Sequence, residues 1–190
     1  MLEISQLPVL QDNYIFMIHC TADNVTAVVD PATASPVLVL LKERNWHLDF
    51  ILNTHHHSDH VGANLELKHK TECTIIGAQK DQQRIPGIDK MVVEGDSLSI
   101  GQHQFEVLEV PGHTSAHIAY WFKDDAILFC GDTLFSLGCG RLFEGTPEQM
   151  WHSLKKIRQL PDQTQIYCAH EYTESNARFA IQLEPGNTTL

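Results

Sequence analysis

Four histidines and an aspartate occupy the six-residue segment His55–His60, which reads HHHSDH. The pattern HxHxDH offers imidazole and carboxylate donors with no thiolate among them. Such donors suit zinc, iron or manganese, and imidazole is the commonest of them. The run is internal and follows an apolar stretch, unlike an affinity tag. We therefore expect His55 and His57 to converge on one ion. Asp59 and His60 would point to a neighbouring position.

Three further ligand-type residues follow strand-like stretches elsewhere in the chain. The pairings are Phe50–Asn53 before His55–His60, Gln104–Val110 before His113, Ala126–Cys130 before Asp132, and Gln165–Ala169 before His170. Sheet enzymes place their chemistry in loops at the ends of strands. The set is too large for one tetrahedral ion. The chain has no CxxC pair, which argues against a closed structural site. Two ions that share a bridging ligand are the economical interpretation.

The remaining patterns predict a mixed α/β chain. Further strands are expected at Tyr14–Cys20, Val25–Asp30, Cys73–Gly77, Lys90–Val93 and His117–Phe122. Helices are expected at Pro36–Trp46, Gly62–Lys70, Pro147–Leu160 and Tyr172–Leu183. Thr146 is a good N-cap for the third of these helices, with Pro147 at its first position.

Length and charge narrow the function. A chain of 190 residues predicts one domain, 1–190, with a sizeable core. Its net charge of −11 argues against nucleic acid as a partner. No stretch reaches the roughly 20 apolar residues of a membrane span, and the N-terminus lacks a signal-peptide pattern. We expect a cytoplasmic monomer whose five cysteines are reduced and buried.

Several motifs together resemble the metallo-β-lactamase superfamily. NTHHHSDHVGAN resembles its signature, and VPGHT, FCGDTLF and CAHEYT follow in the same order. Within the superfamily, GDTLFSLGCGRLFEGTPEQM and AHEYTESNARFA are similar to glyoxalase II, the hydroxyacylglutathione hydrolases. The resemblance runs from LQDNY to LEPGN. It implies an αββα sandwich of two mixed β-sheets flanked by helices.

The resemblance also implies roles for individual residues. One metal would lie on His55, His57 and His113, and the second on Asp59, His60 and His170, with Asp132 bridging both. Zinc is the first expectation for both ions, with iron or manganese as alternatives. Arg141, Phe143 and Tyr172 would contact the glutathione part of the substrate. His56 and His117 match no family ligand, although His117 could support one from behind.

The implied reaction is hydrolysis of a glutathione thioester. S-lactoylglutathione would give glutathione and D-lactate, the second step of methylglyoxal detoxification, through attack by a metal-bridging hydroxide. Asp59 would orient that nucleophile or take its proton. Many family members carry tyrosine where Phe143 stands. The family's C-terminal helical region is mostly absent from these 190 residues, so we expect weakened substrate binding.

Two alternatives remain open. A persulfide dioxygenase shares HxHxDH but uses one iron, and a non-catalytic relative would keep the fold and the metal without turnover. Asp59, Asp132 and His170, together with GRLFEGT and HEYT, favour the hydrolase over the dioxygenase. Metal content and turnover of a glutathione thioester would separate the three.

Overall fold

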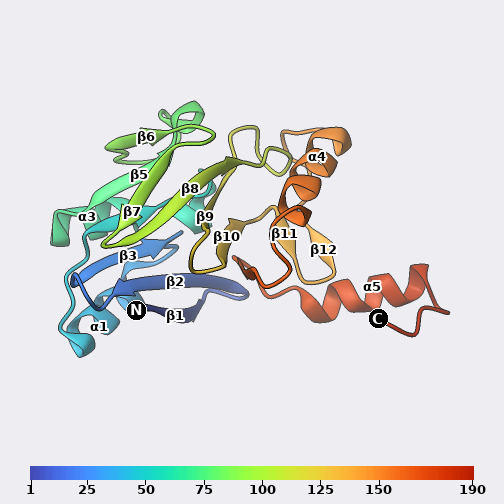
Figure 1. Cartoon of the computed structure of the whole chain (residues 1–190), viewed down its shortest axis with the longest axis horizontal. Helices are drawn as coiled ribbons and strands as arrows, with labels where there is room; N and C mark the ends of the chain where they lie inside the picture. Colours follow the sequence, from blue (N-terminus) through green and yellow to red (C-terminus); the bar gives the residue numbers. More distant parts are fainter.

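Two large β-sheets face each other in the computed structural model, which describes the whole chain, Met1–Leu190 (Figure 1). The first sheet has six strands in the order β1-β2-β3-β4-β5-β6. They are β1 (Leu2–Val9), β2 (Asn13–Cys20), β3 (Val25–Val29), β4 (Phe50–Leu52), β5 (Thr74–Ala78) and β6 (Lys90–Val92). β1 to β3 pair antiparallel, and β3 to β6 pair parallel. The sheet is therefore mixed, as expected.

The second sheet has five strands in the order β13-β10-β9-β8-β7. They are β7 (Ser97–Ile100), β8 (His103–Glu109), β9 (Ile118–Phe122), β10 (Ile127–Gly131) and β13 (Gln165–Cys168). Only the β10–β13 pair is parallel. A small hairpin, β11 (Leu134–Phe135) with β12 (Gly138–Cys139), follows β10.

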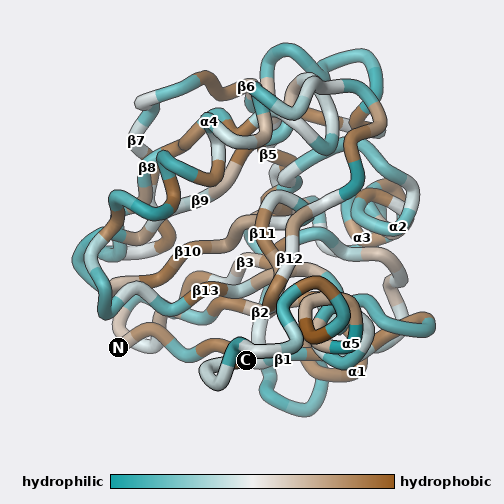
Figure 2. Tube along the Cα trace, turned by 90° about the vertical axis from the view of Figure 1, so that its right-hand side faces the viewer, coloured by the Kyte–Doolittle hydropathy of each residue, from teal (hydrophilic) through white to brown (hydrophobic).

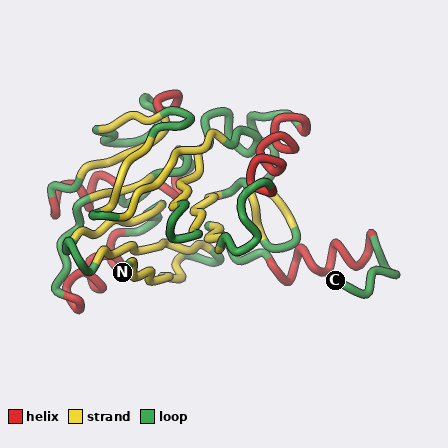
Figure 3. Tube along the Cα trace, in the orientation of Figure 1, coloured by secondary structure: helices red, strands yellow, loops and turns green.

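Helices lie on the outside of the two sheets, as Figure 3 shows. They are α1 (Ala34–Arg44), α2 (Ser58–Val61), α3 (Asn64–Thr71), α4 (Pro147–Arg158) and α5 (Thr173–Leu183), with a 3-10 turn, η1, at Gln79–Asp81. α5 extends away from the sheets at the C-terminal end of the chain (Figure 1) and has no buried residue. No helix has the length and apolar character of a membrane span.

The alternation of side chains along β2 explains the layers. Phe16 and Ile18 belong to an 18-residue cluster of buried apolar side chains between the sheets. Ile15 and Met17 point to the other face and pack in a cluster with residues of α1 and α3. Successive side chains of a strand point to opposite faces, so a strand apolar on both faces must be covered twice. Figure 2 shows the apolar strands running through the interior.

The predicted αββα sandwich is confirmed, with differences in detail. A third cluster packs α4 against the second sheet, and Thr146 forms a capping box with Gln149. β1, β7, β11 and β12 were not predicted. The helix expected at Gly62–Lys70 is α3, which begins at Asn64 and ends at Thr71, and the short α2 before it was not predicted; Gly62 ends α2. A Cβ at Gly62 would lie 2.6 Å from the Ala32 carbonyl oxygen, so the chain passes too close there for any side chain.

Candidate metal centre and active site

The four predicted strand ends meet at one place. His55 follows β4 of the first sheet, and His113, Asp132 and His170 follow β8, β10 and β13 of the second. These three strands of the second sheet run in the same direction, so their carboxyl ends lie at the same edge. The loops surround a cavity of about 780 Å³. The structure therefore brings together the residues that the sequence predicted at these four strand ends.

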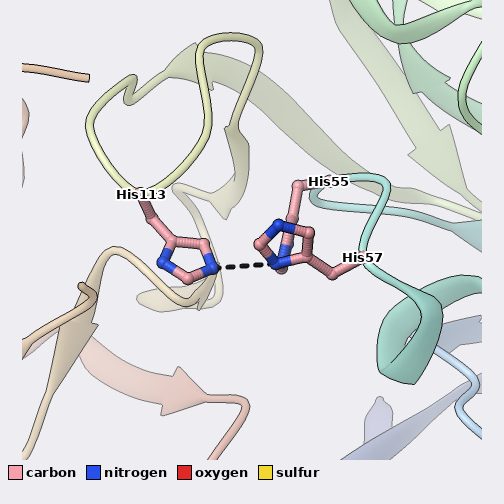
Figure 4. Close-up of side chains that lie close together, drawn as sticks. All are labelled: His55, His57 and His113. Carbon is pink, nitrogen blue, oxygen red and sulfur yellow. Dashed lines mark hydrogen bonds between the residues drawn. The ribbon is translucent and has the colours of Figure 1, made fainter. Parts of the chain in front are cut away.

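The first cluster consists of His55, His57 and His113 (Figure 4). His57 Nδ1 lies 3.1 Å from His55 Nε2 and 3.0 Å from His113 Nε2. His55 and His57 come from the loop after β4, and His113 comes from the loop after β8. His57 has an extended backbone because α2 begins only after it. Three imidazole nitrogens that face one another can all coordinate one metal ion, whereas hydrogen bonds among them cannot satisfy all three.

The second cluster consists of Asp59, His60 and His170. The Asp59 carboxylate lies 3.4 Å from both His60 Nε2 and His170 Nε2. Asp59 and His60 lie in the single turn of α2, directly after the first cluster's His57. The short helix therefore turns the last two ligand-type residues of HxHxDH towards a second position, as the sequence predicted.

Asp132 lies between the two clusters. One of its carboxylate oxygens lies 3.4 Å from His113 Nε2 and 3.4 Å from His170 Nε2, and the other lies 3.4 Å from His60 Nε2. His60 Nε2 and Asp132 Oδ1 are both buried with no hydrogen-bond partner. Buried polar atoms are rarely left without a partner. These two atoms, with an all-nitrogen and oxygen donor set around them, fit a bound divalent cation.

Hydrogen bonds fix the far side of four of the five rings. His55 Nδ1 lies 3.0 Å from Thr54 Oγ1, and His113 Nδ1 donates to the Arg141 carbonyl oxygen at 2.8 Å. His60 Nδ1 donates to Asp30 at 3.0 Å. His170 Nδ1 donates to Asp12 in the same manner, at 2.8 Å. Such contacts orient an imidazole so that its other nitrogen faces a metal.

The electrostatics of the two clusters differ. Burial lowers the pKa of His55, and the neighbouring histidines lower it further. Burial also disfavours the charged form of His170, but Asp132 and Asp59 outweigh it and raise the pKa of His170 to about 10. The pKa of His60 is raised against burial by Asp132 and Asp30. The carboxylates of Asp30, Asp59 and Asp132 therefore stabilise a positive charge at the second cluster, whether it comes from protons or from a cation.

His117 supports the site from behind, as the sequence suggested. Its Nε2 accepts the backbone N–H of Asp132 at 3.1 Å, and its ring stacks on His55 with centroids 4.6 Å apart. Burial lowers the pKa of His117 to about 3, so the ring is neutral and can accept that bond. His117 thus orients the residue that faces both clusters.

The substrate-contact candidates line the same cavity. Arg141, Phe143 and Tyr172 all contribute to its wall. The Phe143 ring lies edge-on to His113 at 5.2 Å, and the Tyr172 ring stacks on His170 at 5.0 Å. The prediction of buried cysteines is wrong at two positions, because Cys168 is only partly buried and Cys139 is exposed and lines the cavity. Cys139 lies in the two-residue strand β12.

Sequence reasoning missed three supporting residues: Asp30, Asp12 and Asn13. Asn13 Nδ2 donates to Asp59 at 3.0 Å. Asp30 directly follows β3, the parallel neighbour of β4, and that position at a shared sheet edge is a signal that could have found it. Asp12 lies just before β2, and Asn13 is its first residue. Because β2 runs antiparallel to β3, its beginning lies at the sheet edge where β3 ends. Nothing in their spacing to the ligands indicates this.

Comparison with known proteins defines the class of this chain. The sequence profile of the Metallo-beta-lactamase superfamily matches residues 8–170, so fold and site are those of that superfamily. Hydroxyacylglutathione hydrolase of Methylococcus capsulatus is 59% identical over all of this chain and 74% of the relative's length. The enzyme of the same name from Rhodospirillum rubrum is 54% identical, again over the whole chain and 74% of its own length. The chain belongs to the hydroxyacylglutathione hydrolase family.

A solved structure with the same fold also contains a metal. TTHA1623, determined in a di-iron-bound form, is 26% identical. It superposes with a TM-score of 0.75 over 89% of this chain and 92% of its own. Together with the clusters described above, membership of the hydroxyacylglutathione hydrolase family shows that this chain is a metal-binding hydrolase.

Proposed function

We propose that the chain hydrolyses glutathione thioesters, with S-lactoylglutathione giving glutathione and D-lactate in the second step of methylglyoxal detoxification. The observation that carries the proposal is one cavity, lined by residues of both clusters together with Arg141, Phe143 and Tyr172. The relatives named hydroxyacylglutathione hydrolase match this chain across its full length. Site and family therefore support the same reaction.

For the metal centre we propose two divalent ions. His55, His57 and His113 would hold one, Asp59, His60 and His170 the other, and Asp132 would bridge them. The contacts of Asp132 with both clusters support the bridge. Zinc remains the first expectation from the nitrogen and oxygen donors. The di-iron form of TTHA1623 supports a two-ion count and keeps iron as an alternative.

When bound, the ions supply Lewis acidity for the thioester carbonyl and an activated water as nucleophile. Asp59 is the proposed catalytic residue of the chain. Its side chain is 36% exposed, unlike the buried histidines beside it, so it can reach the nucleophile. Asn13 fixes its orientation. The neighbouring His170 and His60 lower the pKa of Asp59, which makes it a better group for orienting the water than for retaining its proton.

The wall of the cavity would bind the glutathione part. Arg141 brings a cation suited to a carboxylate or an amide carbonyl. Burial raises the pKa of Tyr172 to about 12, so the phenol stays protonated and can donate a hydrogen bond. Phe143 has no hydroxyl, so its proposed contribution is apolar contact alone. That the protein is monomeric and cytoplasmic remains a prediction.

Metal analysis and a thioesterase assay on the same sample test this function. We expect two ions per chain after purification without chelators, and hydrolysis of S-lactoylglutathione that chelation abolishes. Better turnover of a lactam or a phosphodiester would contradict the substrate assignment. Saturation at one iron would favour the dioxygenase, and full metal content without turnover would favour a non-catalytic relative.

A further inference from the structure

The Gly140–Gly145 loop joins the substrate side of the cavity to the metal side. It carries Arg141 and Phe143, and its backbone is bonded to His113 in two ways. His113 Nδ1 donates to the Arg141 carbonyl oxygen at 2.8 Å, and the Phe143 N–H donates to the His113 carbonyl oxygen at 3.2 Å. Backbone bonds fix the inner side of the loop. They leave open what holds its outer side.

Glu144 anchors the outer side of the loop. Its carboxylate accepts the backbone N–H of Ser115 at 2.8 Å and the Ser115 hydroxyl at 2.7 Å. It also accepts a charge-assisted hydrogen bond from Arg84 Nη1 at 2.6 Å. Ser115 lies two residues after His113, so Glu144 ties the loop a second time to the segment that presents this histidine.

Arg84 continues the contact to the HxHxDH segment. Its Nε donates to Asp81 at 2.7 Å, and its Nη2 forms a second contact with the same carboxylate. The Asp81 side chain is fully buried, and its other oxygen accepts from His56 Nδ1 at 3.2 Å. His56 Nε2 in turn lies 3.6 Å from Glu144. The four side chains form a closed ring.

The ring explains the orientation of His56. This residue stands between two proposed ligands, His55 and His57, yet it does not join their cluster. Asp81 and Glu144 hold its side chain instead. One ring thus contacts the loop with the substrate residues and the segment with the metal residues, and its members lie outside both ligand clusters.

We propose that Glu144 and Arg84 are positioning residues, which set the place of Arg141 and Phe143 relative to the metal-binding histidines and so determine binding of the glutathione moiety. The inference rests on the proposed function. A bidentate guanidinium between two carboxylates fixes distance and angle together, which a single ion pair does not. Loss of the ring should therefore weaken contacts to the non-reacting part of the substrate. The metal ligands themselves remain in place.

The substitution Glu144→Gln tests the proposal, with Glu94→Gln as its matched control. Glu94 also accepts from a cation, Lys156 at 2.8 Å, and from a backbone N–H, that of Glu109, but it does not line the cavity at the metal clusters. For Glu144→Gln we expect about a three- to tenfold rise in KM for S-lactoylglutathione and in the calorimetric Kd for glutathione. Metal content and kcat should stay within about twofold of the wild type.

A short thioester of cysteamine supplies the second readout. It has the reacting carbonyl but lacks glutathione, so its kcat/KM should change by less than about twofold in Glu144→Gln. An equal loss for both thioesters, a loss of metal, or values matching Glu94→Gln would overturn the proposal. A general loosening of the structure would affect both substrates, whereas a positioning role affects only the larger one.

Arg84→Lys keeps the inference testable if Glu144→Gln does not fold. Lysine retains the charge but cannot bond both carboxylates through a planar fork, so we expect KM for S-lactoylglutathione to rise by about two- to fivefold over the wild type. A wild-type KM would overturn the proposal. Failure of the wild type to hydrolyse S-lactoylglutathione would overturn the proposed function instead, and glutathione binding would still report on the ring. Absence of both would overturn both.

Discussion

His60 and Asp30 form a pair in which both side chains are almost fully buried, and His60 Nδ1 donates to Asp30 at 3.0 Å. The same carboxylate accepts the backbone N–H of Thr54 at 2.8 Å and the Thr54 hydroxyl at 2.6 Å. Asp30 therefore fixes the ring of His60 in the second cluster and also Thr54, the residue before His55 of the first cluster. A single side chain at the end of β3 organises both halves of the proposed metal centre.

Asp30→Asn should weaken metal binding, because an amide has one oxygen and cannot accept all three bonds. We expect affinity at the second cluster to fall by about 10- to 100-fold, the usual cost of losing such a support. Titration of the metal-free protein against a chelator would measure it. Asp49→Asn is the control, since Asp49 accepts a backbone N–H from Thr26 away from the site. Equal affinity in the two variants would contradict this role.

Asp132→Ala should reduce the number of metal ions bound per chain. The Asp132 carboxylate faces both clusters, and each proposed ion would lose one ligand on its removal. We expect the content to fall from two ions to one or fewer, with loss of thioesterase activity. Elemental analysis gives the count, and Asp124→Ala on the surface is the control. Retention of two ions would rule out the bridge.

The sequence predicted the site better than the supports around it. Ligand residues such as His113 and Asp132 follow apolar strands. The apolar pattern of such strands can be recognised from the local sequence alone, without knowledge of the strands beside them. β1 and β7 were missed because they are edge strands with half-buried or alternating side chains. An edge strand has a partner strand on one side only, so its side chains are less buried and its apolar pattern is weaker.

Contacts between distant segments could not be predicted from spacing. Asp12 lies 158 residues from His170, and Glu144 lies 60 residues from Arg84. Only the fold brings these residues together. The single turn of α2 was also missed, because four residues are too few to show helical periodicity. Gly62, which ends that turn, is required by the close approach of the Ala32 carbonyl, and that approach is a tertiary effect.

Stability in acid should depend on Glu144. Burial opposes ionisation of this carboxyl, but Arg84 and Ser115 outweigh it and lower the pKa of Glu144 from 4.5 to about 2. The unfolded chain therefore binds the proton first as pH falls. The contribution of Glu144 to stability is present above pH 4.5 and is lost as pH falls towards 2.

Glu144→Gln removes this contribution and should flatten that part of the pH profile. Unfolding of the metal-free protein by urea should show the wild type more stable than the variant near pH 6, with the gap narrowing towards pH 3. Metal-free protein is needed because metal binding has its own pH dependence. A gap that is constant across the interval would contradict the ion pair between Glu144 and Arg84.

Arg141→Met should separate substrate binding from metal binding at one residue. The backbone carbonyl of Arg141, and not its side chain, accepts from His113 at 2.8 Å. The guanidinium lies over the Phe143 ring at 5.7 Å and faces the cavity. We expect KM for S-lactoylglutathione to rise by about ten- to a hundredfold, the value of one charge-assisted hydrogen bond. Metal content should not change, because the bond to His113 survives the substitution.

Arg158→Met, on the exposed side of α4, is the control for loss of a positive charge. A KM equal to that of the control would remove Arg141 from the substrate site, and loss of metal would show that its side chain supports His113 after all.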